Sequence, residues 1–162
     1  MNPRSSRVFW RTFGLALCVS IVPLSAHAET DACTLITAAQ VSAAVGVAVG
    51  SGTHVTPTFL KTCTWTPTAA SSIRAVTVNL QTAAFYEGAK QMAAKTAAAL
   101  PEGKMKPASV GDDAYLLDEG SMAMLFFKKG SASVKVAVYA KMGVDEIEAM
   151  ELAIAKQVAA KL

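Results

Sequence analysis

The sequence is poor in the side chains that most often carry out chemistry. Its 162 residues include only two histidines and three cysteines, and 17% of them are charged. It contains no glycine-rich phosphate loop, no dinucleotide fingerprint and no set of zinc ligands. No serine lies in the elbow motif of the serine hydrolases. These absences argue against the common nucleotide-dependent, zinc-dependent and serine-dependent enzymes.

The N-terminal segment has the pattern of an export signal. Three arginines precede an apolar run over residues 13–24, and Ala26-His27-Ala28 places small residues at the two positions that signal peptidase reads. A lipid-modified Cys18 is one alternative, but Leu17 before it is not small; an uncleaved anchor is another, but the run is short. We expect cleavage after Ala28, which leaves residues 29–162 as a single domain, periplasmic or secreted.

The charge of the segment after Ala28 is balanced. The three N-terminal arginines account for the whole formal net charge of +3, so the remaining residues carry equal numbers of acids and bases. This balance gives no electrostatic reason for a nucleic-acid or anionic membrane partner. Nothing after the signal approaches the roughly 20 apolar residues of a membrane span. We therefore expect no nucleic-acid partner and no stable membrane span after cleavage.

Two cysteines remain after cleavage, Cys33 and Cys63. An even number of cysteines in an oxidising compartment favours a disulfide. Closing a loop of about 30 residues contributes roughly 3–4 kcal/mol in the chain-entropy account. The alternative is a metal site built on two free thiols, but His54 is then the one histidine left to help complete it. A disulfide between Cys33 and Cys63 is the favoured interpretation.

Hydrophobic periodicity and turn signals divide residues 29–162 into nine elements. The capping-box pattern Thr37-Ala38-Ala39-Gln40 predicts a helix that Gly46 ends. Asp145 and Glu148 are expected to cap a last helix that reaches Leu162. Between these helices we expect a weak strand or loop over 47–58, strands over 60–66, 74–81, 114–117, 122–128 and 133–140, and a helix over 82–99 whose apolar stripe is Phe85, Ala89, Met92 and Ala93.

The expected order is α-β-β-β-α-β-β-β-α. Tight glycine-containing turns over 118–121 and 129–131 connect the later strands, which is typical of an antiparallel meander. The sequence therefore predicts an α+β sandwich with one disulfide, in which an antiparallel sheet of five to six strands carries helices mainly on one face.

One predicted strand, over 122–127, is apolar on both of its faces. A one-sided antiparallel sheet leaves one face of each strand in water, so two interpretations stay open. In the first, this is the central strand, covered by the last helix on one side and by the first helix or the loop over 47–58 on the other. In the second, the strand contributes a surface for an apolar ligand or a partner protein. The candidate residues of that surface are Met122, Met124, Leu125 and Phe127.

Catalytic and metal-binding patterns are weak. His54 lies in a glycine-containing context, which is typical of a solvated loop histidine. Asp112 and Asp113 form a candidate carboxylate pair, although the surrounding residues read as a turn that leads into a strand. The methionines fit core packing better than soft-metal binding. We therefore predict no catalytic residue, no metal and no cofactor, with the carboxylate pair kept as a minor candidate.

Four short motifs follow one another along the chain: Cys33-x-Leu35-Ile36-Thr37, Val45-Gly46, Cys63-x-Trp65 and Val110-Gly111-Asp112-Asp113-Ala114-Tyr115. In this order they resemble a family of small exported bacterial proteins. The members are often lipoproteins, are abundant in actinobacteria and form a domain of unknown function. The resemblance implies pairing of Cys33 with Cys63, Trp65 packed nearby, no known catalytic residue, and the α/β sandwich of the photosystem oxygen-evolving subunit P group. The lipobox of the lipoprotein members is missing here.

Together these features predict an exported, non-enzymatic binding or interaction protein whose partner is an unknown protein of the envelope. The main alternative is a carrier of a small apolar ligand, bound beside the strand over 122–127. An inhibitor or immunity protein is a further alternative. A hydrolase is the last, and it would have to use His54 or the Asp112–Asp113 pair.

Overall fold

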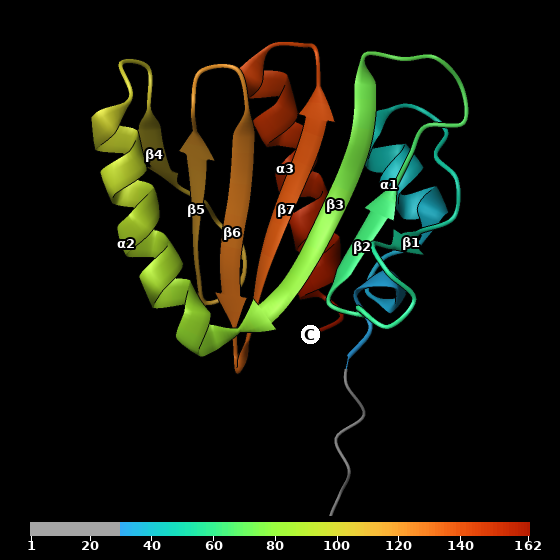
Figure 1. The fold of residues 1–162 in the computed structure, drawn as a ribbon, viewed down its shortest axis with the longest axis horizontal. Helices are drawn as coiled ribbons and strands as arrows, with labels where there is room; N and C mark the ends of the chain where they lie inside the picture. The colour runs from blue at the N-terminus through green and yellow to red at the C-terminus, as the bar shows by residue number, and fades with distance from the viewer. Residues whose placement is uncertain (1–29) are drawn as a thin grey trace, which may run out of the picture.

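The structure is a computed structural model that describes residues 30–162, so the predicted signal segment and its cleavage site lie outside the described residues. Within this range one antiparallel sheet carries helices on both faces (Figure 1). The helices are η1 (Ala32–Thr34), α1 (Ala38–Val45), α2 (Ala83–Ala99) and α3 (Val144–Ala159). The strands are β1 (Thr53–His54), β2 (Thr62–Trp65), β3 (Ile73–Thr82), β4 (Lys104–Pro107), β5 (Asp113–Asp118), β6 (Ala123–Lys129) and β7 (Ala132–Ala140).

The α+β class is confirmed, but the expected number of five to six strands is wrong. Residues 30–162 form a seven-stranded sheet in the order β1-β2-β3-β7-β6-β5-β4, and every pair is antiparallel. The strand absent from the prediction is β4, which pairs with β5 at one edge. It has four residues, among them Lys104, Lys106 and Pro107. Lysine and proline are typical of short edge strands and mask the alternation that identifies a strand in sequence.

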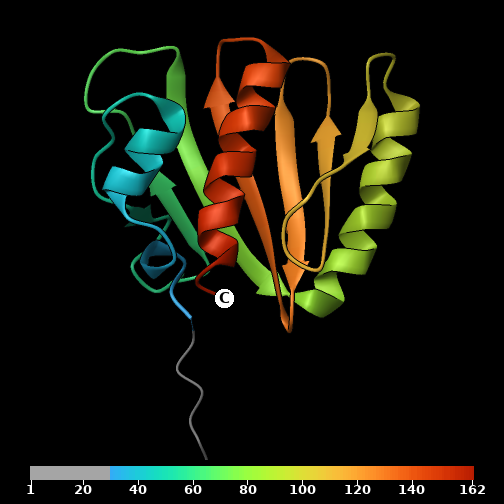
Figure 2. The same ribbon diagram turned by 180° about the vertical axis from the view of Figure 1, so that it is seen from behind.

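The main core lies between the sheet and the helices α1 and α3 (Figure 2). Alternate residues of β3, β6 and β7 point into it, as period-2 burial requires. None of the helices within residues 30–162 combines the length and the apolarity that crossing a membrane demands. The most deeply buried strand residues of this core include Val76, Val78, Leu125, Phe127, Val134, Val136 and Val138.

The strand β6 lies inside the sheet, between β5 and β7. Its residues Leu125 and Phe127 are 0% exposed in the core beneath α3. Its other face is partly covered by α2, not by α1 or the loop over 47–58 as the sequence led us to expect. Helices therefore pack on both faces of the sheet, although two of the three α-helices in the described residues share one face, as predicted.

The helix termini differ in how well the sequence predicted them. At α1 the Thr37 side chain and the Gln40 side chain form the predicted capping box, and Gly46 ends the helix in the left-handed conformation at φ 72°. At α3 the expected Asp145–Glu148 capping pair is wrong. This helix begins after Gly143, which has no side chain to cap it. Glu148 binds Lys106 of β4 instead, at 2.8 Å.

The predicted disulfide is confirmed: Cys33 of η1 is bonded to Cys63 of β2. Cys63 is fully buried and Trp65, on the same face of β2, is 1% exposed. A Cβ atom at Gly52 would lie 2.5 Å from Cys63 Sγ and 2.9 Å from the Trp65 ring. The backbone at Gly52 therefore packs directly against the disulfide and the indole, which explains why a glycine stands there.

Candidate functional site

The helix α2 covers only part of its face of the sheet. It contacts β4, β5 and β6 on the face opposite α3 (Figures 1 and 2). Its residues Tyr86 and Ala93 are buried there, against Tyr115 and Leu117 of β5. The helix also contacts β3 and β7, but over most of these two strands and over β2 no helix of the described residues lies on this face (Figure 1). Half of the face is therefore left without a covering layer, with α2 as its wall.

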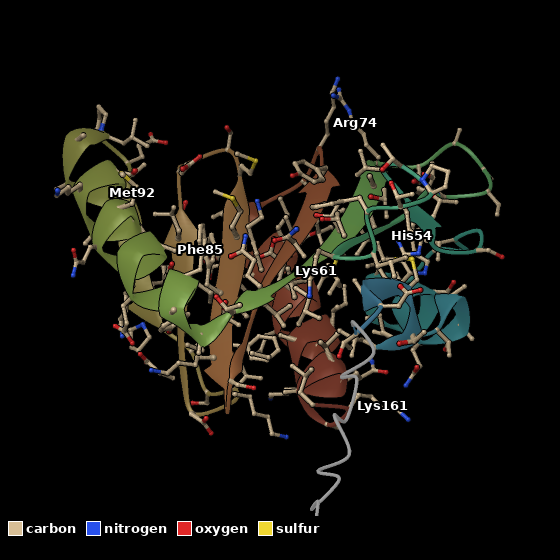
Figure 3. All side chains as sticks on the ribbon, turned by 60° about the horizontal axis from the view of Figure 1, so that its bottom comes forward. His54, Lys61, Arg74, Phe85, Met92 and Lys161 are labelled. Carbon is tan, nitrogen blue, oxygen red and sulfur yellow. A yellow bond between two sulfur atoms is a disulfide. The ribbon has the colours of Figure 1, made fainter. Side chains whose placement is uncertain are left out.

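The apolar stripe predicted for α2 is not buried as a whole. Phe85 is 53% exposed and Met92 is 64% exposed, so the expectation that both lie in the core is wrong (Figure 3). Successive residues of an α-helix are about 100° apart, so each of them lies roughly a quarter turn from its buried neighbour, Tyr86 or Ala93. The apolar surface of α2 thus extends a quarter turn beyond the part that contacts the sheet.

This exposed apolar surface forms one wall of a groove of about 560 Å³, which is within the usual size range of small-molecule sites. The floor consists of one residue from each of four strands: Gln81 of β3, Lys135 of β7, Phe126 of β6 and Leu117 of β5. The helical wall consists of Ala84, Phe85, Gly88, Ala89, Met92, Ala93 and Thr96.

The helical wall of the groove includes small residues. Gly88 is the clearest case, since a Cβ atom placed on it would meet no heavy atom within 4 Å. Glycine in a helix interior costs about 0.5–1 kcal/mol relative to alanine. The packing of the protein does not require the glycine at this position. A larger side chain at Gly88 would project into the groove without displacing any other part of the described chain.

Among the described residues Lys135 is the one charged side chain that lines the groove, and none of the residues in the lining is acidic. Within residues 30–162 Lys135 has no ion pair. The two lysines nearby, at the other side of α2, are neutralised: Lys90 binds Asp113 at 2.6 Å and Lys128 binds Glu87 at 2.9 Å. An apolar groove with one unpaired cation favours an apolar ligand with a negative head group.

Aromatic rings support the groove from below. The Tyr115 ring stacks on Phe126 with 4.9 Å between centroids, and it contacts Tyr86 at 5.6 Å. Burial raises the pKa of both tyrosine hydroxyls, and the nearby Asp113 carboxylate raises it further. Both hydroxyls therefore stay protonated at neutral pH, so neither acts as a base or a nucleophile there.

The residues predicted for an apolar surface fall into two groups. Leu125 and Phe127 are core residues on the α3 side of the sheet. Met122 and Met124 are half-buried, and Met124 packs beneath α2. None of the four lines the groove, whereas their neighbour Phe126 does. The sequence did not single out any other groove residue as a surface either, among them Phe85, Gly88, Met92 and Lys135.

The two carboxylates of the minor candidate site have separate structural partners. Asp112 accepts a hydrogen bond from the Gly130 backbone N–H at 2.7 Å and braces the turn between β6 and β7. Asp113 binds Lys90 of α2, and this hydrogen bond holds the pKa of Asp113 below its ordinary value. Each carboxylate thus links two elements of the fold, which accounts for both without a catalytic role.

His54 is not a solvated loop residue, which corrects the interpretation from sequence. It lies on β1 with 20% of its side chain exposed, within 4.8 Å of ligand atoms of Asp31 and Cys33. Three such side chains are the minimum for a protein zinc site. Because Cys33 is disulfide-bonded, it provides no thiolate, and the cluster retains two ligands. The residues therefore do not fit a metal centre.

No protein-family model matches the chain, and neither a curated protein nor a solved structure matches it. The family resemblance of the four short motifs stays a prediction. The functional assignment below therefore depends on the geometry of residues 30–162.

Proposed function

We propose that this protein is an exported binding protein without enzymatic activity, which holds a long-chain carboxylate in the groove between α2 and the open half of the sheet. The exposure of Phe85 and Met92 along that groove carries the proposal. Two large apolar side chains that line a hollow are typical of a ligand-binding surface, and burial by a hydrocarbon chain would remove their contact with water.

The free energy gained by burying a hydrocarbon chain sets a lower limit on the length of the ligand. A chain of about fourteen methylene groups contributes at most about 11 kcal/mol when it is fully buried. Association costs at least about 4 kcal/mol in lost translational and rotational freedom. The remainder of about 7 kcal/mol corresponds to a Kd of roughly 10 μM. A shorter chain of about ten methylenes would bind only in the millimolar range.

Lys135 gives the ligand its expected charge. A carboxylate that emerges from the apolar groove near this residue would form an ion pair that no described residue of the protein offers. Since Lys135 is half-exposed, water and salt weaken this pair, and about 0.2–1 kcal/mol is the expected contribution. Most of the affinity then comes from the chain, and the head group mainly sets the orientation.

The composition of the groove supports binding and not hydrolysis. Among the described residues its lining holds no histidine, cysteine, aspartate, glutamate or serine, so the Thr96 hydroxyl and the Lys135 ammonium have no carboxylate or imidazole in the lining to activate them. His54 lies on β1, at the edge of the sheet away from α2, and Asp113 is paired with Lys90. The hydrolase alternative therefore has no suitable residue at the site.

A fluorescent long-chain carboxylate tests the proposal directly. Gly88→Leu fills the groove, and Ala94→Leu is the matched control because Ala94 is exposed on the same helix but does not line the groove. We expect saturable binding to the wild-type protein and the control, and a loss of at least about tenfold in Gly88→Leu. Lys135→Gln should weaken carboxylate binding about two- to fivefold and leave the alcohol of equal length unaffected.

Three results would contradict the proposal. Equal binding by Gly88→Leu and the wild-type protein would place the ligand elsewhere. The carrier function would be refuted if carboxylates of ten to eighteen carbons, which are about as long as one membrane-lipid tail, showed no saturable binding. A partner protein of the envelope that cross-links to the groove would favour the interaction module instead. Native mass spectrometry of the protein isolated without reducing agent would show the natural ligand as an added mass.

A further inference from the structure

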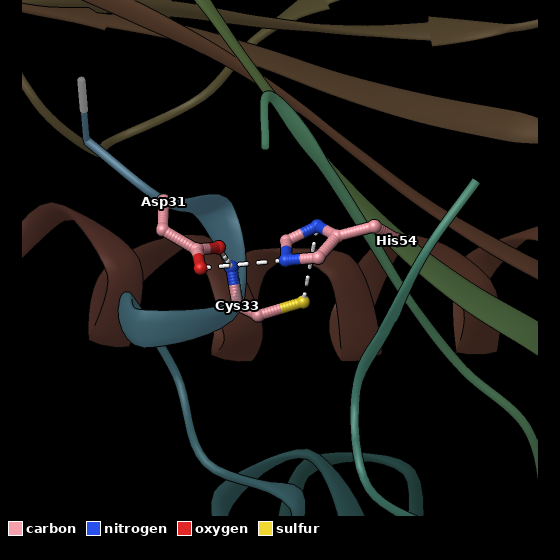
Figure 4. Close-up of side chains that lie close together, drawn as sticks. All are labelled: Asp31, Cys33 and His54. Atoms are coloured by element: carbon pink, nitrogen blue, oxygen red, sulfur yellow. Dashed lines mark hydrogen bonds and ion pairs between the residues drawn. The ribbon is translucent and has the colours of Figure 1, made fainter. Parts of the chain in front are cut away.

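Asp31, His54 and Cys33 form a line of functional groups at the edge of the sheet (Figure 4). His54 Nε2 lies 3.3 Å from Asp31 Oδ2, and His54 Nδ1 lies 3.7 Å from Cys33 Sγ. Asp31 is fixed in turn, because its Oδ1 accepts a hydrogen bond from the Cys33 backbone N–H at 2.7 Å. The imidazole ring is thus held between a carboxylate and one sulfur of the disulfide.

Both ring nitrogens of His54 face groups that accept hydrogen bonds. Besides Asp31, the Thr62 carbonyl oxygen lies 3.2 Å from Nδ1. Carbonyl and carboxylate oxygens can only accept, so the doubly protonated ring satisfies both contacts at once. The cationic form of the ring then points a proton-bearing nitrogen at the region that Cys33 Sγ occupies. A thiolate at that sulfur would be stabilised by this charge.

The two sulfur atoms differ in accessibility. Cys63 is 0% exposed in the core, whereas Cys33 is half-exposed on η1. The register of β1 on β2 places His54 opposite Cys63, so the imidazole lies next to the disulfide that joins η1 to β2. A reagent from solvent therefore reaches Cys33 before Cys63.

We propose that the Cys33–Cys63 disulfide is a redox-exchange site that a dithiol reduces, and that the reduced protein presents Cys33 as a reactive thiolate paired with the His54 imidazolium. Asp31 orients the ring and is a positioning residue. This site is independent of the groove beside α2, since the two share no residue.

The exchange proceeds in two balanced steps. A thiolate of the dithiol attacks Cys33 Sγ, the disulfide bond breaks, and Cys63 leaves and takes up a proton. The remaining thiol of the dithiol then attacks the dithiol sulfur that is bonded to Cys33. This closes the disulfide of the oxidised dithiol and releases Cys33 as a thiolate, which His54 stabilises. Two electrons pass from the dithiol to the two cysteines. Of the two protons that the dithiol loses, one is held by Cys63 and the other goes to solvent.

Alkylation of the reduced, folded protein tests the proposal. The protein is equilibrated with dithiothreitol, its fold is checked by circular dichroism, and iodoacetamide is added between pH 5 and pH 9, with each cysteine identified by peptide mass. We expect Cys33 to react at least about tenfold faster than Cys63 at pH 6. His54→Gln should move the midpoint of the Cys33 profile about one unit higher and favour the disulfide at equilibrium. Thr53→Gln, on the opposite face of β1, is the matched control and should change neither.

Several results would overturn this inference. Equal reactivity of Cys33 and Cys63 in the wild-type protein at pH 6 would refute it, and this measurement does not depend on whether a variant folds. Resistance of the disulfide to dithiothreitol until the protein unfolds would make it purely structural. A His54→Gln variant with a lower melting temperature but an unmoved alkylation profile would assign His54 a packing role only.

Discussion

The carboxyl group of Glu151 leads to a prediction about stability and pH. Glu151 lies on α3 and is 0% exposed. Its Oε1 accepts a hydrogen bond from the Val138 backbone N–H at 2.9 Å. The pairing of β6 with β7 ends at Leu125 and Val136, so Val138 has no strand partner on the side of β7 that faces β6. The carboxyl group of Glu151 takes the place of that partner. Its Oε2 has no hydrogen-bond partner within the described residues.

Burial raises the pKa of Glu151 from 4.5 to about 8, and the neighbouring Glu148 carboxylate adds to the rise. The folded protein therefore binds this proton more tightly than the unfolded chain does. Between pH 4.5 and pH 8 the free energy of unfolding falls as pH rises, by about 1.4 kcal/mol per unit. Glu151 alone should thus remove about 3 kcal/mol of stability between pH 5 and pH 7, and its contribution is fully favourable only below pH 4.5.

The variant Glu151→Gln isolates this contribution, because a neutral amide keeps an oxygen for the Val138 N–H and does not titrate. Urea unfolding of both proteins at pH 5, 6, 7 and 8 gives the difference in stability at each pH. We expect the wild-type protein to lose about 3 kcal/mol relative to the variant between pH 5 and pH 7. Every other titrating group is common to both proteins and cancels. A difference that stays constant from pH 5 to pH 8 would show that the carboxyl group ionises normally, and would refute this reasoning.

Two further predictions concern packing. Phe127→Ala should lower the free energy of unfolding in urea by about 3–5 kcal/mol, because Phe127 is fully buried. Phe126→Ala in the groove should lower it clearly less. Equal losses would contradict the assignment of the two residues to opposite faces of the sheet. Gly111→Ala should destabilise more than Gly130→Ala, although both glycines have φ near +60°. At Gly111 the new Cβ would clash with the Lys128 carbonyl oxygen, whereas at Gly130 no heavy atom of the described residues lies within 4 Å. Equal melting temperatures for these two variants would show that the chain relaxes around the clash.

Sequence patterns predicted helices and strands well where one face of the element is buried and the other is exposed to solvent. The strand over 74–81 and the last helix were both predicted in the correct place, and each has one buried side and one exposed side. The helix α1 was predicted to its last residue, because its capping box and Gly46 act locally. The strand β4 could not be found in this way, since its hydrogen bonds come from β5 and its four residues carry two lysines and a proline.

The candidate sites depended on tertiary packing that periodicity does not report. A helical apolar stripe indicates burial on average, but whether a second layer covers it depends on the rest of the chain. At α2 that layer is missing, and Phe85 and Met92 are exposed as a result. The sequence of α2 carries one local indication of this exposure. Its apolar arc is unusually wide, with Tyr86 at one side and Phe85 at the other. At His54 the neighbouring Gly52 indicated a loop, although it is there because the chain passes against the disulfide.

The positions of the two proposed sites make them separable in a single protein. Phe85 and Met92 of the groove lie on α2, whereas His54 lies at the β1 edge, at the other end of the molecule in Figure 3. Cys63, which lies opposite His54 in the register of β1 and β2, points into the core beneath α1 and α3. Changes at distant sites without shared partners usually have additive effects. Gly88→Leu should therefore leave the alkylation profile of Cys33 unchanged, and His54→Gln should leave carboxylate binding unchanged. If either variant alters both readouts, the sheet between them must respond as a unit, and ligand binding would then depend on the redox state of the disulfide.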